Sequence, residues 1–277
     1  MSTTLTILSD NLPGDKLQSE HGFAVHVQTS STSVLFDTGQ GAVFSANARS
    51  LGIDLESLDL LVLSHGHYDH TGNVAQVLAY NPGIHVHCHP AVLLSRYGVR
   101  HGKAFPIGIP DASRAALLSL PADQLHRSAQ FHRLTEGVYF SGTIPRVTSF
   151  EDTGGNFFLD STLFHQDTLH DDMALYIVHG DALTVVTGCC HSGIVNTVTH
   201  AMSCFPNVRL HTVLGGLHLL NASQERLERT IHALAQLNLT ALVLCHCTGS
   251  AQGNAVKRAL GDIVSLGHTG LQLDFTA

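Results

Sequence analysis

The sequence has few of the features that mark membrane proteins or nucleic-acid-binding proteins. Only 13% of its 277 residues are charged, and no window reaches the roughly 18 apolar residues that a membrane-spanning helix needs. The formal net charge is −8, and the 14 lysines and arginines form no basic stripe. Nucleic acid is therefore a disfavoured partner unless bound metal supplies positive charge. The opening residues MSTTLTILSDN lack a basic segment followed by an apolar stretch, so we expect a cytoplasmic protein with no membrane contact.

Motifs of several other catalytic classes are also missing. The chain has no GxSxG nucleophile elbow, no GxxxxGK[ST] phosphate loop and no GxGxxG dinucleotide motif. The six cysteines have neither the paired spacing of a zinc finger nor the density of a secreted scaffold, and we expect reduced, mostly buried thiols. With 44% hydrophobic residues, the chain can form one compact α/β domain over residues 1–277.

Residues 60–72 carry the strongest signal in the chain. They read LLVLSHGHYDHTG, so an apolar strand ends at Ser64 and four potential metal ligands follow within six residues. His65 and His67 form one pair, and Asp69 and His70 form a second, so a loop leaving the strand can direct two pairs at two adjacent ions. The alternative is a solvated polar loop without metal. The strand before the motif and the helix expected after it favour a metal site.

Helical patterns follow this loop and recur near the C-terminus. Val74, Val77 and Leu78 form an apolar stripe, which Thr71 or Asn73 can cap and which Pro82 ends. Residues 113–120 and 223–238 show the same helical spacing, and the second of these stripes indicates core packing.

The motif HGHYDH resembles the HxHxDH signature of the metallo-β-lactamase fold hydrolases. The resemblance extends to VLFDTG at residues 34–39, where this family places an aspartate that supports the metal loop, here Asp37. It implies an α/β fold of the four-layer αβ/βα sandwich type, with metals at the rim where the two sheets meet. We therefore expect His65, His67, Asp69 and His70 to bind metal.

An internal repeat is consistent with this architecture. Residues 58–65 (LDLLVLSH) are echoed by residues 239–246 (LTALVLCH), and residues 34–39 are echoed by residues 185–191 (VVTGCCH). The repeat predicts two similar halves, at about 1–94 and 147–277, with an inserted cap at about 95–146. With the resemblance, it assigns His191 and His246 as the ligands of the second half. Taken singly, either histidine could instead be a core or capping residue.

A narrower resemblance is to the dihydropteroate-synthase-like branch, whose members are similar to 7,8-dihydropterin-6-methyl-4-(β-D-ribofuranosyl)aminobenzene 5'-phosphate synthase. Its motifs stand here as TGCCHSG, GGLHL and CHCTG, and GTIPR carries Thr143 where the branch usually has glutamate. The wider superfamily has a metal-bridging aspartate after the TG turn, where this chain has Cys189 or Cys190. Buried structural cysteines are common, so both are left out of the expected ligand set. His170 competes with His191 for the place of the third histidine.

Candidate substrate-binding residues are less sharply indicated. His218 in GGLHL is expected to contact substrate, as are Arg146 and His89. Arg96, Lys103 and Arg146 could place positive charge over the metals, but solvated surface cations are an equal alternative. His85, His87 and His89 alternate on one face of an expected short strand, which favours a polar strand face over a second metal site.

These observations predict a hydrolase with two divalent metal ions that uses metal-bound hydroxide on a small anionic, phosphate-containing substrate. Zinc is the favoured ion, with manganese or iron as alternatives, and Asp69 and His191 are expected to have catalytic as well as ligand roles. The alternatives are a pterin-linked transferase that releases pyrophosphate, a lactonase or thioesterase, and a metal-binding sensor without turnover. A homo-oligomer is left open.

Overall fold

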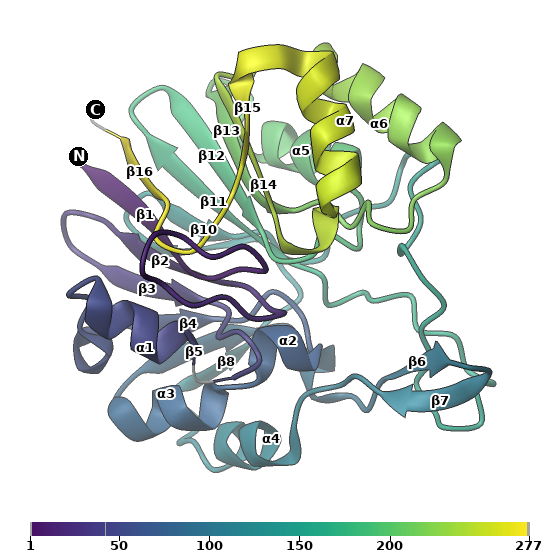
Figure 1. Ribbon diagram of the computed structural model, residues 1–277. Coiled ribbons are helices and arrows are strands. Elements are labelled where there is room, and N and C mark those ends of the chain that lie inside the picture. The colour runs from purple at the N-terminus through teal and green to yellow at the C-terminus, as the bar shows by residue number, and fades with distance from the viewer. Residues whose placement is uncertain (1, 42, 276–277) are drawn as a thin grey trace.

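A computed structural model describes residues 2–41 and 43–275 and contains two large mixed sheets that face each other (Figure 1). Each sheet has seven strands. The first sheet contains, in spatial order, β16 (Gln272–Phe275), β1 (Thr3–Ser9), β2 (Ala24–Gln28), β3 (Ser33–Phe36), β4 (Leu60–Val62), β5 (His85–Cys88) and β8 (Leu125–Arg127). The second contains β15 (Val264–Leu266), β14 (Ala241–Cys245), β13 (Arg209–Gly216), β12 (Ala182–Thr187), β11 (Ala174–His179), β10 (Val138–Phe140) and β9 (His132–Thr135).

Helices cover the outer face of each sheet. The helices beside the first sheet are α1 (Val43–Ser50), α3 (Val74–Tyr80) and α4 (Asp111–Leu118), and a single turn, α2 (Tyr68–Thr71), lies in the metal loop. The helices beside the second sheet are α5 (Ile194–Cys204), α6 (Gln224–Ala235) and α7 (Ser250–Leu260). Short 3₁₀ turns occur at η1 (Leu55–Ser57), η2 (Pro90–Leu93), η3 (His246–Thr248) and η4 (Gly261–Ile263).

Three separate apolar clusters fill the three spaces between these four layers. Alternation along the strands separates the side chains: Leu61 of β4 packs with Val77 of α3, whereas Val62 packs between the sheets. In the second half, Leu242 packs with α5 to α7, and Val243 faces the first sheet. The protein is therefore an α/β four-layer αβ/βα sandwich, as the sequence predicts.

The internal repeat corresponds to strands that carry candidate ligands at their carboxyl ends. β3 and β4 are parallel neighbours in the first sheet, and β12, β13 and β14 are successive parallel strands in the second. Because parallel strands end at the same edge of a sheet, the loops after β3 and β4 lie at one edge of the first sheet, and those after β12 and β14 lie at one edge of the second.

Residues 95–146 do not form one inserted cap. Only the hairpin of β6 (Tyr97–Arg100) and β7 (Lys103–Pro106) extends away from the sandwich, and Tyr97 pairs with Phe158 of a long loop beside it (Figure 1). By contrast, α4 packs on α3, β8 pairs with β5, and β9 and β10 join the second sheet. The expected cap is thus too wide, because short strands inside it complete the edges of both sheets.

The predicted helices form with small shifts in their ends. The apolar stripe of Val74, Val77 and Leu78 is buried, and α3 ends before Pro82. Asn73 occupies the capping position, but its side-chain amide donates to the carbonyl of Thr38 instead of capping the helix. All six cysteines are free, and five are buried. Among the described residues, no helix is long and apolar enough to span a membrane.

Candidate metal centre

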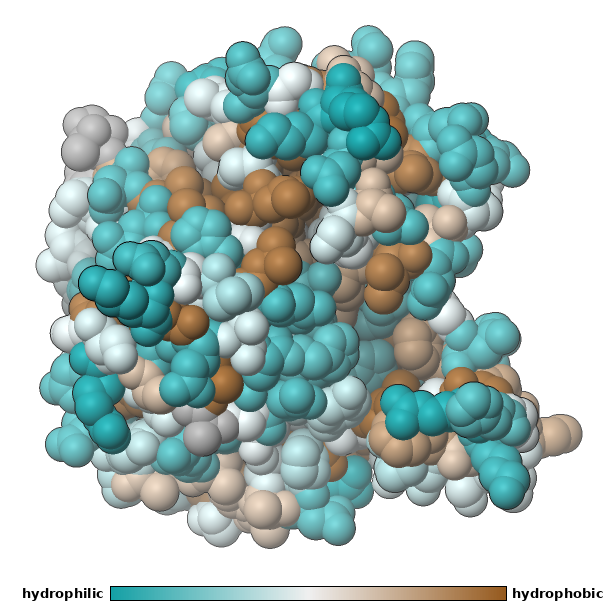
Figure 2. Space-filling view, viewed as in Figure 1, coloured by the Kyte–Doolittle hydropathy of each residue, from teal (hydrophilic) through white to brown (hydrophobic). Residues whose placement is uncertain are grey.

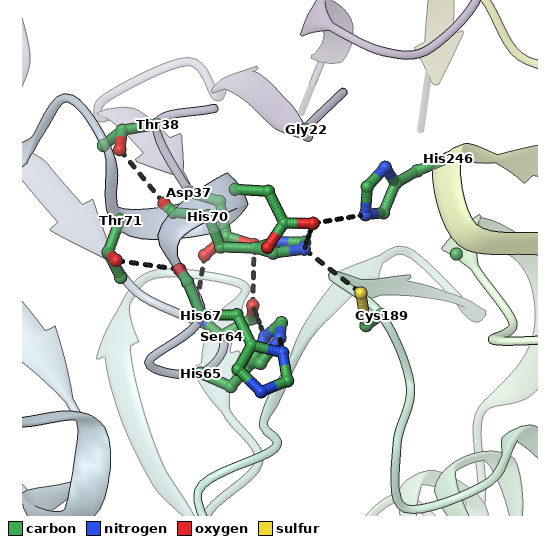
Figure 3. Close-up of polar contacts among 12 residues, drawn as sticks. Gly22, Asp37, Thr38, Ser64, His65, His67, His70, Thr71, Cys189 and His246 are labelled. Atoms are coloured by element: carbon green, nitrogen blue, oxygen red, sulfur yellow. Dashed lines mark hydrogen bonds and ion pairs between the residues drawn. The ribbon is translucent and has the colours of Figure 1, made fainter. Parts of the chain in front are cut away.

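The metal loop leaves β4 and is held in place by Asp37 at the end of β3. One carboxylate oxygen of Asp37 accepts from the backbone N–H of Ser64 at 2.7 Å, and the other accepts from the Ser64 hydroxyl at 2.6 Å and from Nδ1 of His70 at 2.6 Å (Figure 3). Asp37 is fully buried and adopts a φ of +60°. Through these three hydrogen bonds Asp37 holds the loop in place.

Two glycines allow the backbone to approach these groups closely. A Cβ at Gly188 would lie 2.2 Å from the Ser64 hydroxyl and 2.8 Å from the Asp37 carboxylate. A Cβ at Gly66 would lie 2.2 Å from the Arg96 guanidinium. A larger residue at either position would have to displace the support of the metal loop.

The second half brings two histidines from separate turns to this loop. The ring centroid of His191, in the turn after β12, lies 4.9 Å from that of His65 and 5.0 Å from that of His67. The ring of His246, which follows β14, lies 5.1 Å from that of His70, and its Nε2 lies 3.3 Å from the carboxylate of Asp69. The six predicted ligands are therefore gathered at one place, and all are buried.

In three of these histidines a partner outside the centre holds Nδ1, and Nε2 faces the other candidate ligands. Nδ1 of His191 donates to the carbonyl of Thr153 at 2.7 Å, and Nδ1 of His246 donates to the side chain of Asn11 at 2.9 Å. Nδ1 of His70 donates to Asp37, as described above. Such partners fix the ring orientation and direct Nε2 at a metal.

The donor atoms fit divalent cations. Nε2 of His67 and Nε2 of His191 are buried and have no hydrogen-bond partner among the described residues. Leaving buried polar atoms unpaired costs free energy, and a bound cation would pair both nitrogens at once. Imidazole nitrogens with one carboxylate are a donor set that suits zinc, iron and manganese.

Burial and neighbouring charges set the protonation of the site. Burial lowers the pKa of His65, His67 and His191 well below the usual range, which favours the neutral form that binds metal. Burial alone would raise the pKa of Asp69, but the charges of His70 and hydrogen bonds from His21 and His246 hold it well below its usual range. For His70 burial acts in the opposite direction and would lower the pKa, but the charges of Asp37 and Asp69 raise it to about 9.

Four further side chains, Cys189, His21, His218 and Cys247, lie among the candidate ligands. Sγ of Cys189 lies 3.1 Å from Nε2 of His70, and Nε2 of His21 lies 3.1 Å from the Asp69 carboxylate. Among the described residues, four groups have potential ligand atoms within 4.8 Å of one another: His65, Cys189 and His191; His70, Cys189 and His246; Cys189, His218 and Cys247; and His21, Asp69 and His246. His67 is in none of these groups, although its ring lies 5.0 Å from that of His191. His21 gives no signal in the sequence because it lies outside any motif, and Cys189 is left out of the expected ligands because buried structural cysteines are common.

Backbone strain is concentrated around this centre. Four residues with L side chains adopt positive φ there, and these are Asp37 (60°), Cys190 (64°), His218 (47°) and His246 (47°). Such conformations are unfavourable for residues other than glycine, and they cluster at functional sites where the surrounding structure enforces them.

Of the expected substrate-binding residues, His218 lies in the centre, whereas Arg146 and His89 do not. The ring of His218 lies 4.1 Å from that of His191, within the centre. Arg146 donates to the carbonyls of Thr168 and Leu169, and His89 caps η2 by accepting from the N–H of Ala91. Neither has a contact in the described structure with the gathered ligands.

The expected cations and the competing histidine do not lie over the centre. Arg96 is 1% exposed and forms ion pairs with Asp167 at 2.7 Å and Asp171 at 2.6 Å, so it is a buried support and not a surface cation. Lys103 is exposed on the hairpin, and His170 is exposed outside all four groups.

His85 and His87 lie on a strand with a polar face, as expected. Their rings stack on His126 of β8, with centroids 5.3 Å and 4.5 Å away, while Val86 and Cys88 pack in the core. None of these histidines is in a group of potential ligands among the described residues.

Comparisons with known proteins agree with this geometry. The sequence profile of the metallo-beta-lactamase superfamily matches residues 20–246. The chain is 27% identical to 7,8-dihydropterin-6-methyl-4-(beta-D-ribofuranosyl)-aminobenzene-5'-phosphate synthase of Methanocaldococcus jannaschii over 93% of this chain and 90% of the relative. It is 31% identical to an uncharacterized protein of the same organism over 95% of this chain and 100% of the relative. The crystal structure of a metal-dependent hydrolase of the beta-lactamase superfamily matches with a TM-score of 0.82, at 28% identity, over 99% of this chain and 100% of that one.

Proposed function

The chain belongs to the metallo-β-lactamase superfamily, and we propose that it is a binuclear metal-dependent hydrolase of small anionic substrates that contain a phosphate ester or pyrophosphate. The observation that carries this proposal is the convergence of ligands from both halves. Nε2 of His67 and Nε2 of His191 are buried and unpaired, and their rings are 5.0 Å apart although they come from different sheets. Buried nitrogens in this arrangement are matched by a cation.

Two sets of residues are suited to hold the ions. His65, His67 and His191 would hold one ion, and Asp69, His70 and His246 would hold the other. When bound, two divalent ions lower the pKa of water toward roughly 7 and stabilise negative charge that develops on the substrate.

The protein supplies orientation and exclusion of water around that chemistry. The ring of Phe157 lies 5.3 Å from His67 and 5.2 Å from His191 and covers one side of the centre. His21 is the exposed member of the candidate groups, and Nε2 of His21 already contacts Asp69. Its imidazole therefore connects bulk water to the Asp69 carboxylate.

The charges around the centre favour a small substrate that the ions themselves recognise. Arg96 and Arg146 are engaged by carboxylates and carbonyls of the protein, so neither is free to pair with a substrate anion. A pocket of about 170 Å³ lies beside His246, and its lining includes Asn11, Leu220 and Ser250. The surface is also hollowed beside the β6–β7 hairpin (Figure 2), which leaves room for access from that side.

A pterin-linked transferase that releases pyrophosphate is the second candidate. It is favoured by the similarity to the M. jannaschii synthase, which extends over 93% of this chain. Both candidates require the same two ions and differ in whether water or an amine-bearing substrate attacks.

Hydrolysis of bis(4-nitrophenyl) phosphate by protein reconstituted with zinc, manganese or iron tests the proposal. We expect turnover that depends on the metal. Losing a hydrogen-bond partner of a ligand typically costs roughly 10- to 100-fold, and His67→Ala should reduce turnover by more than this because it removes a ligand itself. His170→Ala is the matched control, because His170 is exposed whereas His67 is buried in the centre, and its turnover should stay at the wild-type level.

Two outcomes would contradict the proposal. Metal binding without turnover of this diester, of phosphate monoesters or of pyrophosphates would indicate a sensor. Equal turnover in wild type and in a correctly folded His67→Ala variant would place the activity elsewhere.

A further inference from the structure

Cys189 occupies the position between the two sets of ligands. Its Sγ lies within 4.8 Å of ligand atoms of His65 and His191 in one candidate group, and of His70 and His246 in another. Figure 3 shows its sulfur directed at His70 from a loop of the opposite half, and Cys189 is 2% exposed. No other residue belongs to both of these groups among the residues that the structure describes.

The next residue points the other way. Sγ of Cys190 lies 3.3 Å from the hydroxyl of Thr197, and its side chain packs with Ile194 and Val198 between the second sheet and its helices. Cys190 adopts a φ of +64°. Cys190 is therefore a matched control for Cys189, because the sulfur of Cys189 lies in the centre and that of Cys190 lies in the core.

Most carboxylates near this position are held by other partners. Asp37 accepts from Ser64 and His70, and Asp171 accepts from the N–H of Gly66 and from Arg96. One oxygen of Asp172 accepts from the N–H of Ser192, and the other is unpaired among the described residues. Asp69 belongs to one candidate group, with His21 and His246, whereas Cys189 belongs to candidate groups of both sets of imidazoles. The sulfur of Cys189 is therefore the anionic group best placed to be shared.

We propose that the thiolate of Cys189 is the ligand shared by the two metal ions. This inference rests on the proposed function, because it requires that both ions bind. With both ions bound, Cys189 would hold them as a thiolate, and its proton would be released to solvent. A thiolate is a soft ligand, so the site should select zinc or iron over magnesium and calcium.

X-ray absorption at the zinc edge tests the proposal on the zinc-loaded full-length protein. A terminal thiolate would give about 0.5 sulfur per zinc averaged over two ions, whereas a shared thiolate gives about one sulfur per zinc, at about 2.3 Å. We expect the shared value in wild type and in Cys190→Ser, and loss of the sulfur signal in Cys189→Ser. Zinc per protein is measured on every sample.

Cys189→Asp is the second variant, because it keeps an anionic side chain at this position if Cys189→Ser fails to fold. We expect it to bind two zinc ions with nitrogen and oxygen neighbours only. Persistence of sulfur in this variant would overturn the proposal and assign the signal to Cys247, the other thiol of the candidate groups.

The outcomes separate this inference from the proposed function. Two zinc ions with no sulfur neighbour in wild type would overturn the role of Cys189 and leave the binuclear hydrolase intact. A protein that binds no zinc, manganese or iron would overturn both.

Discussion

The two halves of the molecule build the candidate metal centre in different ways. The first half supplies His65, His67, Asp69 and His70 from one loop after one strand, and Asp37 of the neighbouring strand holds that loop. The second half supplies its two histidines from separate turns after β12 and β14. The outer partner of His191 is the carbonyl of Thr153, and that of His246 is Asn11 near the N-terminus.

This difference separates ligands that are neighbours in the sequence from ligands that come together only on folding. The four first-half ligands come from one short stretch of sequence, and Asp37 of β3 and Asp171 of the second half hold that loop. The second-half ligands depend on segments that come together only in the complete sandwich. We therefore expect the two halves to respond differently to changes in their supports.

The largest effect on stability is expected at Arg96, which pairs with Asp171, a distant residue that holds the first-half loop. Asp171 accepts from the N–H of Gly66 in that loop and also pairs with Arg96, which is buried. Arg96→Met leaves Asp167 and Asp171 buried without their cation, so the free energy of unfolding should fall by roughly 3–5 kcal/mol. Because the chain has no tryptophan, chemical unfolding is followed by far-UV circular dichroism.

Arg127→Met is the control, because Arg127 is an exposed arginine on an edge strand of the first sheet. Its unfolding free energy should change by no more than about 0.5 kcal/mol. An equally small change in Arg96→Met would show that the first-half loop needs no support from the segment around Asp171.

A smaller effect is expected from a histidine buried in the first sheet. Nε2 of His26 lies 2.8 Å from the hydroxyl of Ser33, and burial lowers the pKa of His26 to about 4. Below pH 6.5 the unfolded chain takes up a proton at this residue and the folded chain does not. Stability that is present above pH 6.5 is therefore lost as the pH falls toward 4, by up to about 3 kcal/mol.

His26→Gln should reduce this loss, measured as the change in unfolding free energy between pH 7 and pH 4.5. His179 in the second sheet is also buried, contacts the hydroxyl of Thr184 at 3.0 Å and has a pKa lowered by burial. His179→Gln should therefore act in the same direction. An unchanged pH dependence in His26→Gln would contradict the assignment of a neutral, buried imidazole.

The outer partners of the ligands give the smallest effect and the sharpest comparison of the halves. Asp37→Asn removes a charged acceptor from His70, and Asn11→Ala removes a neutral acceptor from His246. Losing such a partner typically costs about 10- to 100-fold in metal affinity, and charge-assisted bonds are the stronger ones. Asp37→Asn should therefore weaken zinc binding more than Asn11→Ala in competition with a chelator. The reverse order would indicate that the second half controls the affinity.

The sequence is sufficient to predict the layers of the fold and the part of the centre that depends on strand ends. The loop at residues 65–70 follows a buried strand, and His191 and His246 follow strands that repeat the first-half pattern. Parallel strands end at one edge of their own sheet, so the pattern places the ligands of each half together. That the two edges meet is implied by the resemblance to the metallo-β-lactamase family.

Other features depend on contacts that no local pattern reports. Arg96 is buried because two carboxylates 71 and 75 residues away surround it. The directions of Cys189 and Cys190 depend on the conformation of one turn, and spacing treats the two residues as equal. The expected cap was too wide because β8 and β10 are three-residue strands, which are too short to show alternation.

Ligands from both halves are proposed to surround a pair of metal ions. An anomalous difference map at the zinc edge, from crystals of the zinc-loaded protein, locates the ions and their ligands. We expect two peaks, one contacted by His65, His67 and His191 and the other by Asp69, His70 and His246. A single peak bound only by residues of the first-half loop, with His191 and His246 turned away, would contradict this proposal.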